Sequence, residues 1–287
     1  MITVSNTVPN VVIFTDLDGT LLDHYTYGYD AAADLLEALY SAKIPVIPVS
    51  SKTRAELTAL CAELDLGHGF VAENGALACV PKPPLPGEES IRESFGTCEC
   101  RAFTKPAEHW QEMVRELACE YEFTTFSASS VEEIASLTGL DDHSTENAMK
   151  REYGEVLCWR DSRDKLDALA VSLERRGATV TRGGRFVHVT GHVDKGQAMD
   201  WVVSQLTKSW GTAPKAVAAG DGENDIPMLA RADVSVVVRS PVNGYPDWDL
   251  AQSPPGQRVI QTEREGPAGW RDGMILALQH IGVPLSL

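Results

Sequence analysis

Two carboxylates, Asp16 and Asp18, stand two residues apart in the segment V-V-I-F-T-D-L-D-G-T, residues 11–20. The five residues before Asp16 are mostly apolar and β-branched, and this pattern predicts a short buried strand. Gly19 follows at once, so the backbone can turn sharply and approach a bound group closely. Two acids at the end of a buried strand suit a Mg²⁺ site and a carboxylate nucleophile. The alternative is a strand end followed by an ordinary Asp-Gly turn.

Two further apolar runs, at residues 44–49 and 215–220, also end in polar residues. Because the carboxyl ends of parallel strands meet at one edge of a sheet, we expect these polar groups to converge with Asp16. Lys195 opens a predicted helix, and we expect it beside them. The polar residues at the two strand ends include Ser50, Ser51, Asp221, Asn224 and Asp225.

Together these groups meet the needs of phosphoryl transfer, which requires positioning and charge neutralisation. Asp16 can attack phosphorus and form an aspartyl-phosphate, while Asp18 can protonate the leaving oxygen and later deprotonate the attacking water. Mg²⁺ prefers oxygen ligands, and the carboxylates of Asp16 and Asp221 with the main-chain carbonyl of Asp18 would suit it. Ser50 would donate a hydrogen bond to a phosphoryl oxygen, and Lys195 would supply the compensating positive charge.

Each of these groups also has a purely structural interpretation. Ser50 and Ser51 could end a strand and cap a helix. Lys195 could be an exposed lysine in a first helical turn, although a cation is slightly unfavourable there. The segment G-D-G-E-N-D, residues 220–225, could be an acidic turn, although so many acceptors at one strand end favour a functional role.

The motifs need a frame that holds these strand ends together. Strands and amphipathic helices alternate along the chain, which is typical of a parallel doubly wound sheet. We therefore expect an α/β fold, a Rossmann-like parallel-sheet core with an inserted α+β cap domain. The expected core elements are strands at 11–15, 44–49, 69–72, 215–220 and 234–238 and helices at 29–43, 54–64, 194–206, 226–231 and 268–280.

The alternation of strands and helices stops near residue 81. Four prolines and a glycine lie between residues 81 and 87, which predicts a linker or loop. We assign residues 83–191 to a cap that sets substrate specificity, and residues 1–82 and 192–287 to the core. The expected cap elements are strands at 98–104, 123–128, 154–159 and 185–190 and helices at 106–119, 130–137, 143–151 and 162–176.

The 287-residue chain carries a formal net charge of −16 at pH 7, which argues against nucleic acid and anionic membranes as partners. A small anionic substrate is still allowed, because a binding site depends on its local charges. No apolar run approaches the ~20 residues that a membrane helix needs. Residues 1–10 have neither the basic nor the apolar region of a signal peptide, so we expect a cytoplasmic protein.

Six cysteines are spread along the chain, and only Cys98 and Cys100 are close in sequence. Their C-E-C spacing is not that of a zinc site. We therefore expect all six to be reduced structural thiols, with zinc or a disulfide as the minor alternative. The other four cysteines are Cys61, Cys79, Cys119 and Cys158.

Four motifs follow one another along the chain, D-L-D-G-T, P-V-S-S-K-T, D-K-G-Q-A-M and G-D-G-E-N-D-I-P-M-L. This set resembles the signatures of the haloacid dehalogenase superfamily of phosphatases. The resemblance implies Mg²⁺ as cofactor, Asp16 as nucleophile and Asp18 as acid/base. It also implies that Ser50 and Lys195 bind phosphate and that Asp221 binds the metal. The additional candidates are Gly19 and Ser51 for phosphate and Asp18, Asn224 and Asp225 for the metal.

Three segments around the cap resemble the family of mannosyl-3-phosphoglycerate phosphatases: F-V-A-E-N-G-A, R-E-Y-G-E-V-L-C-W and T-R-G-G-R-F-V-H-V-T-G-H-V-D-K-G-Q-A-M. That family removes phosphate to give mannosylglycerate, a compatible solute. Arg185 can grip a carboxylate with its planar fork, and the glycerate part of this substrate carries one. The other candidates for substrate binding are Glu73, Asn74, Arg151, Gly184 and His188.

The candidates in the cap segments have structural alternatives as well. Arg185 could be a solvated arginine in a hairpin, and His188 alternates with Phe186 along a strand, so it could be a core histidine. Glu73 and Asn74 could bind sugar hydroxyls or form an ordinary Asn-Gly turn.

Three readings of the function follow from the residues and the resemblance. The first is a phosphatase of a small anionic sugar phosphate, either the mannosyl compound, its glucosyl analogue or another such as sucrose phosphate. The second is a sugar phosphomutase, which would return the phosphoryl group to its substrate. The third is a receiver-like phosphorylation switch, which the presence of Asp18 beside Asp16 and the large cap disfavour. A homodimer is compatible with each reading.

Overall fold

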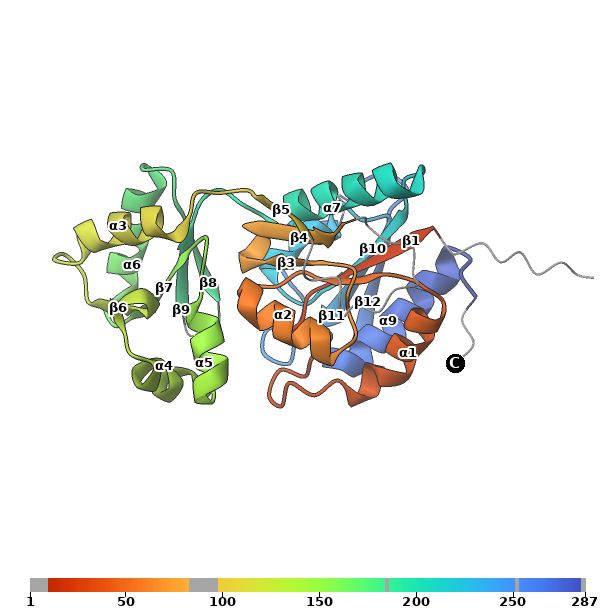
Figure 1. Ribbon diagram of the computed structural model, residues 1–287, viewed down its shortest axis with the longest axis horizontal. Helices are drawn as coiled ribbons and strands as arrows, with labels where there is room; N and C mark the ends of the chain where they lie inside the picture. Colours follow the sequence, from red (N-terminus) through yellow and green to blue (C-terminus); the bar gives the residue numbers. More distant parts are fainter. Residues whose placement is uncertain (1–9, 83–97, 184–185, 251–252, 285–287) are drawn as a thin grey trace, which may run out of the picture.

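A computed structural model describes residues 10–82, 98–183, 186–250 and 253–284 (Figure 1). Within them, five parallel strands form a sheet in the order β12-β11-β10-β1-β2. The chain leaves β1 for β2 on one side and, after the insert, reaches β10 on the other. The end of β1 is therefore the point where open α/β sheets bind their ligands. The strands are β1 Val11–Thr15, β2 Val46–Pro48, β10 Lys215–Gly220, β11 Val234–Arg239 and β12 Arg258–Glu265.

Helices cover both faces of this sheet (Figure 1). Side chains alternate along β1, so that Val11 and Ile13 pack in one buried cluster with residues of α1, α2 and α9. Val12 and Phe14 pack in a second cluster, with residues of α7 and α8. A strand buried on both faces fixes the position of the residues that follow it. The helices are α1 Ala33–Ser41, α2 Arg54–Glu63, α7 Lys195–Trp210, α8 Ile226–Leu229 and α9 Gly266–His280.

A small antiparallel sheet continues the core beyond β2. Its strands, in the order β3-β4-β5, are β3 Phe70–Ala72, β4 Leu77–Pro81 and β5 Cys98–Ala102. A parallel bridge between Val49 and Val71 connects it to the end of β2. The strand expected at 69–72 is therefore present, but its ladder partner is antiparallel β4. The strand expected at 98–104 also pairs with β4, on the core side of the molecule.

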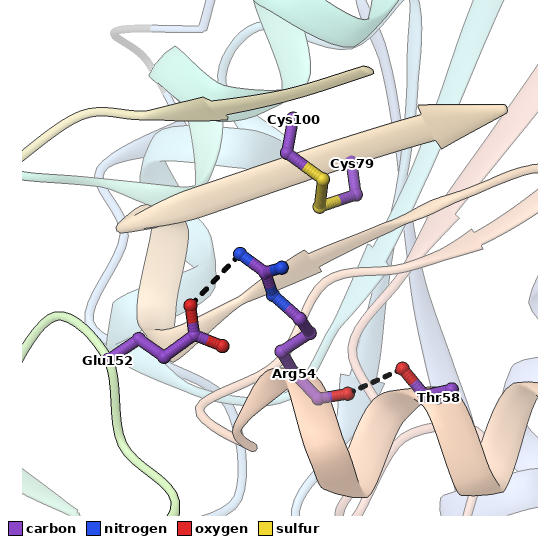
Figure 2. Close-up of a disulfide and its surroundings, with 5 residues drawn as sticks. All are labelled: Arg54, Thr58, Cys79, Cys100 and Glu152. Atoms are coloured by element: carbon purple, nitrogen blue, oxygen red, sulfur yellow. Dashed lines mark hydrogen bonds and ion pairs between the residues drawn. A yellow bond between two sulfur atoms is a disulfide. The ribbon is translucent and has the colours of Figure 1, made fainter. Parts of the chain in front are cut away.

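One disulfide joins β4 to β5 (Figure 2). Cys79 lies directly opposite Cys100 in the antiparallel register, with their Cα atoms 4.1 Å apart. The prediction that all six cysteines are reduced is therefore wrong. The two cysteines are 21 residues apart in the sequence, and only the pairing of β4 with β5 brings them together. The local spacing of cysteines, such as that in C-E-C, carries no information on such a pair.

The insert forms a separate antiparallel sheet in the order β6-β7-β9-β8, flanked by four helices (left in Figure 1). Its own core, around Leu157 and Leu169, is distinct from the two clusters of the parallel sheet. The expected fold class is confirmed: a parallel α/β core with inserted antiparallel sheets. The elements are β6 Phe123–Thr125, β7 Glu155–Trp159, β8 Thr179–Gly183, β9 Phe186–Thr190, α3 Ala107–Leu117, α4 Val131–Thr138, α5 Asp142–Met149 and α6 Arg163–Glu174.

Two edge strands, β8 and β12, were not predicted from the sequence. Both are mostly polar: β8 is T-V-T-R-G, and the apolar residues of β12, R-V-I-Q-T-E-R-E, are only Val259 and Ile260. This composition hides the strand pattern that the central strands show. In the described part of the chain, no helix has the length and apolar character needed to cross a membrane.

Candidate active site

The ends of β1 and β10 and the start of α7 bring two carboxylates and one ammonium together. Lys195 Nζ donates to Asp16 Oδ1 and to Asp225 Oδ1, at 2.6 Å in each case. All three residues are buried, and Lys195 is only 1% exposed. The expectation that these groups converge at one sheet edge thus agrees with the geometry. An ammonium shared by two buried carboxylates offsets part of the cost of burying their negative charges.

Local structure fixes Lys195 in this position. Asp194 is the N-cap of α7, and its Oδ1 accepts a hydrogen bond from the backbone N–H of Gln197 at 2.7 Å. Gly75, at φ 99°, lies so close to this helix start that a Cβ there would be 2.3 Å from the carbonyl oxygen of Asp194. The turn after β3 therefore needs glycine to let α7 approach the strand ends.

Three carboxylates could hold a metal ion at this edge of the sheet. Asp16, Asp221 and Asp225 each offer an oxygen atom within 4.8 Å of the others. Thr20 Oγ1 donates to Asp221 Oδ1 at 3.1 Å, which orients that side chain. Nearby Asp18 has a buried Oδ1 for which the described residues supply no hydrogen-bond partner. Hard carboxylate oxygens of this kind are the ligands that Mg²⁺ prefers.

Burial and mutual repulsion shift the proton affinities of this group. Burial raises the pKa of Asp16 well above its ordinary value, against the opposing effect of Lys195. Burial, followed by the charge of Asp225, also raises the pKa of Asp221. Burial lowers the pKa of Lys195, but Asp16 and Asp225 more than reverse this, so the net shift is upward. One ammonium leaves negative charge unbalanced here, and a divalent cation would relieve it.

The serines at the end of β2 lie at the same edge. Ser50 is buried, and its Oγ accepts a hydrogen bond from the backbone N–H of Lys52 at 3.3 Å. The Ser51 carbonyl oxygen accepts from Arg151 Nη2 at 3.0 Å, so this residue touches the cap through its backbone. Gly19 has φ 85°, and a Cβ there would be 2.8 Å from Asp221 Oδ2. Only glycine leaves this space open, and the role of Gly19 in phosphate binding stays a prediction.

Lys52 is a site residue to which the sequence argument gave no role. Its Nζ donates to Asp18 Oδ2 at 2.8 Å and lies 5.4 Å from the centre of the Tyr27 ring. Burial lowers the pKa of Lys52, but the charges of Asp18 and Glu56 outweigh this and leave it raised. The sequence feature that could have indicated a role for Lys52 is its position in S-S-K-T, directly after the two serines.

Glu73 joins the turn after β3 to the cap. Its carboxylate accepts the backbone N–H groups of Glu152 at 2.8 Å and Tyr153 at 3.2 Å. Arg151 Nε lies 3.5 Å from Glu73 Oε2. Burial raises the pKa of Glu73, and Arg151 opposes the shift. Both carboxylate oxygens are thus already engaged. Asn74 follows, and its Oδ1 accepts from the amide of exposed Asn224 at 3.2 Å.

His188 lies on β9, an inner strand of the cap sheet. Burial, together with the positive charge of Arg151, lowers the pKa of His188 to about 3. Its Nδ1 is buried, and no described residue forms a hydrogen bond with it. His188 is thus a neutral imidazole on the cap sheet, within range of the charge of Arg151. Gly184 and Arg185, also predicted to bind substrate, lie outside the described residues.

Comparison with known proteins agrees with this arrangement. The family model of haloacid dehalogenase-like hydrolases matches residues 13–242. A glucosyl-3-phosphoglycerate/mannosyl-3-phosphoglycerate phosphatase of Methanococcoides burtonii is 32% identical over 267 residues, 92% of this chain and 96% of that protein. A phosphatase of the same name from Persephonella marina is 31% identical over 272 residues, 94% of this chain and 98% of that protein.

A solved structure with the same fold is the sucrose-phosphatase of a Synechocystis species in complex with sucrose and phosphate. It aligns with a TM-score of 0.59 at 16% identity, over 95% of this chain and 98% of that one. This likeness concerns the fold. The match over residues 13–242 and the two relatives above 30% identity show that the chain belongs to the haloacid dehalogenase-like hydrolases.

Proposed function

We propose that this chain is a Mg²⁺-dependent phosphatase that hydrolyses mannosyl-3-phosphoglycerate to mannosylglycerate and phosphate. The observation that carries the proposal is the buried group at the sheet edge, in which Lys195 bridges Asp16 and Asp225 with Asp221 alongside. The names of the two relatives, which cover 92% and 94% of the chain, support a glycosyl-3-phosphoglycerate as the substrate.

In the proposed mechanism Asp16 is the nucleophile. One of its carboxylate oxygens attacks phosphorus, and the bond between phosphorus and the ester oxygen breaks. Asp18 gives the leaving oxygen its proton, so that the sugar-acid alcohol departs. Asp18 then takes a proton from water, whose oxygen attacks phosphorus and releases phosphate from Asp16. Two residues along one turn can serve both steps because Asp18 follows directly beyond the buried end of β1.

The phosphoryl group needs donors and positive charge around it. Ser50 would donate its hydroxyl hydrogen, and Ser51 would bind through its backbone N–H or hydroxyl. Gly19 leaves the space for close approach, and Lys195 balances the negative charge. The metal would be held by Asp16, Asp221 and Asp225 with the main-chain carbonyl of Asp18, and it would screen the repulsion between nucleophile and phosphate.

The cap would bind the part of the substrate beyond the phosphate. Arg151 and His188 offer a guanidinium and a neutral imidazole on the cap side. The division predicted from the sequence is residues 1–82 and 192–287 for the core and residues 83–191 for the cap. Because β5 pairs with β4 of the core, we propose instead a first boundary near Phe103.

The glucosyl compound is the second candidate substrate. The names of both relatives include glucosyl-3-phosphoglycerate beside the mannosyl compound, and the two sugars differ only in the orientation of one hydroxyl. A phosphatase that accepts both would need few contacts with that hydroxyl.

Phosphate release with Mg²⁺ tests the proposal. The panel contains mannosyl- and glucosyl-3-phosphoglycerate, sucrose phosphate, trehalose phosphate and simple hexose phosphates. We expect a kcat/KM for the mannosyl compound at least ~100-fold above that for the hexose phosphates, about 2.7 kcal/mol of discrimination. A flat profile would reject the assigned substrate, and a product that retains all its phosphate would indicate a mutase.

A further inference from the structure

Lys52 lies beside the proposed acid/base and has no role in the mechanism above. Its side chain is 18% exposed, and its Nζ is 2.8 Å from Asp18 Oδ2. The ring of Tyr27 lies beside the same ammonium, although Tyr27 itself has φ 58°, a left-handed conformation that costs energy for a residue with a side chain. A strained backbone therefore places an aromatic ring against the Lys52 ammonium, which restricts its position.

The two lysines of the site differ in how far their donors are used. Lys195 Nζ donates to two carboxylates and is fully buried. Lys52 Nζ has three N–H donors, and among the described residues only Asp18 accepts a hydrogen bond from it. Lys52 is therefore the lysine with donors left for a ligand.

The loop that carries Lys52 lies at the contact between core and cap. Residues on both sides of Lys52 contact the segment 147–152, as Figure 2 shows for Arg54 and Glu152. A substrate with its phosphate at the strand ends and its remaining part bound by the cap would place that part at this junction, next to Lys52. The contacts are Arg151 Nη2 to the Ser51 carbonyl at 3.0 Å, Thr53 Oγ1 to the Asn147 carbonyl at 2.8 Å, and Arg54 Nη2 to Glu152 at 2.9 Å.

We propose that Lys52 is a specificity residue whose ammonium binds the carboxylate of the leaving group. The inference rests on the proposed function, because Asp18 must then lie about 2.6–3.2 Å from the leaving oxygen. Lys52 Nζ is one hydrogen bond farther away, at 2.8 Å from Asp18. In a 3-phosphoglycerate ester two carbon atoms separate that oxygen from the carboxylate carbon. An ammonium at this place reaches the carboxylate while Lys195 stays with the phosphate.

The preferred substrates are then phosphate esters of hydroxy acids. When a carboxylate binds, the Lys52 ammonium is shared between it and Asp18, and both contacts are charge-assisted hydrogen bonds in a partly buried place. A sugar phosphate without a carboxylate offers no acceptor to the remaining N–H groups of Lys52. It also displaces the water that would otherwise bind them. The site therefore discriminates against substrates that lack the acid.

A matched pair of substrates tests this inference. One is mannosyl-3-phosphoglycerate, and the other is the same compound with its carboxylate reduced to a hydroxymethyl group. We expect the wild-type kcat/KM to favour the acid by ~100-fold or more. Lys52→Met should reduce this preference to about tenfold or less, mainly through a higher KM for the acid, whereas Lys52→Arg should keep most of it.

Lys165→Met is the matched control variant. Lys165 also pairs with an aspartate, Asp161, at 2.7 Å, but it is 52% exposed and lies on the cap helix α6. Its loss should leave the preference for the acid unchanged. Thermal melting of each variant checks that it is folded, and Lys52→Gln, which keeps a donor without the charge, replaces Lys52→Met if that variant does not fold.

The outcomes separate the inference from the proposed function. If the wild type hydrolyses neither ester, the proposed function fails. If it hydrolyses both with equal kcat/KM, the phosphatase stands and the inference is overturned. If Lys52→Met lowers kcat/KM for both esters by the same factor, the ratio is unchanged and Lys52 serves Asp18 alone, which also overturns the inference.

Discussion

Two buried ionic clusters in this molecule are built in different ways. The strand-end cluster consists of Asp16, Lys195 and Asp225, and the core fold alone supplies it. The seam cluster consists of Glu73 and Arg151, and it joins the turn after β3 to the segment before β7. In the strand-end cluster each ionic contact is 2.6 Å long, whereas the seam pair is separated by 3.5 Å.

The difference reflects what holds each cluster. Buried strands packed on both faces position the strand-end cluster, so its geometry forms with the core. The seam cluster depends on Glu73, at φ 50°, and on Arg151, whose buried Nε has no hydrogen-bond partner among the described residues. A strained residue and an unsatisfied donor weaken the seam. The rigid cluster therefore suits chemistry, and the weaker one suits a cap that opens and closes.

Asp16→Asn should have the largest effect, because it removes the proposed nucleophile while leaving the strand end in place. We expect phosphate release to fall by ~10³-fold or more. The hydrogen bond from Lys195 can persist to the amide oxygen, so the fold and substrate binding should survive. Steady-state phosphate assays and a binding titration with substrate measure the two effects separately. Activity close to wild type would remove Asp16 from the mechanism.

Lys195→Met should destabilise the fold more than any change at the seam. It leaves two buried carboxylates without their shared cation, which costs about 3–5 kcal/mol. Urea unfolding in the presence of a chelator measures this loss. Saturating Mg²⁺ should recover part of it, because a cation bound only by the folded state stabilises that state.

The exposed Lys165–Asp161 pair gives the control for that measurement. Lys165→Met should cost less than about 1 kcal/mol. Equal losses in the two lysine variants would show that burial of the strand-end cluster does not matter. The contrast between the two clusters would then be unfounded.

The two carboxylates of the strand-end cluster could be located from the sequence because they follow apolar runs. Strand periodicity located Asp16 and Asp225, the rule for parallel sheets brought them to one edge, and the helix expected to start near residue 194 placed Lys195 beside them. The same reasoning predicted the α/β fold class, which the structure confirms. The order of strands and helices in the core could be predicted because buried strands are nearly continuous apolar runs.

The contacts between distant segments could not be predicted in this way. The Cys79–Cys100 disulfide depends on which strands pair, and the partners of Glu73 depend on how the cap meets the core. Lys52 belongs to a recognised motif, yet only the three-dimensional structure shows its contact with Asp18. Sequence periodicity reports the environment of one segment, whereas such contacts depend on two segments at once.

Glu73→Ala should weaken the seam by about 1–3 kcal/mol, because two backbone N–H groups lose their acceptor and Arg151 loses its ion-pair partner. The loss should be smaller than that of Lys195→Met. Urea unfolding measures it, and small-angle scattering should show a more extended molecule as the cap separates from the core. Glu73→Gln keeps an acceptor oxygen. Its loss of stability and its extension in scattering should each be about half of those of Glu73→Ala or less. A compact Glu73→Ala variant of unchanged stability would contradict the role of Glu73 at the seam.

His188 should give the seam a dependence on pH that the variant His188→Asn lacks. The pKa of His188 is lowered to about 3 in the folded protein, whereas in the unfolded chain it has its ordinary value of 6.5. Between these two pH values the unfolded chain therefore binds a proton that the folded protein does not bind. The stabilisation is thus complete above pH 6.5 and is lost as pH falls from 6.5 toward 3. Between pH 7 and pH 5 the free energy of unfolding should fall by at most about 2 kcal/mol more in the wild type than in His188→Asn. Arg151→Met should reduce this difference as well, since the charge of Arg151 helps to keep His188 neutral. If the free energy of unfolding falls equally in the wild type and in His188→Asn over this range, protonation of His188 does not contribute to the pH dependence. Solvent must then supply the hydrogen-bond partner of its Nδ1.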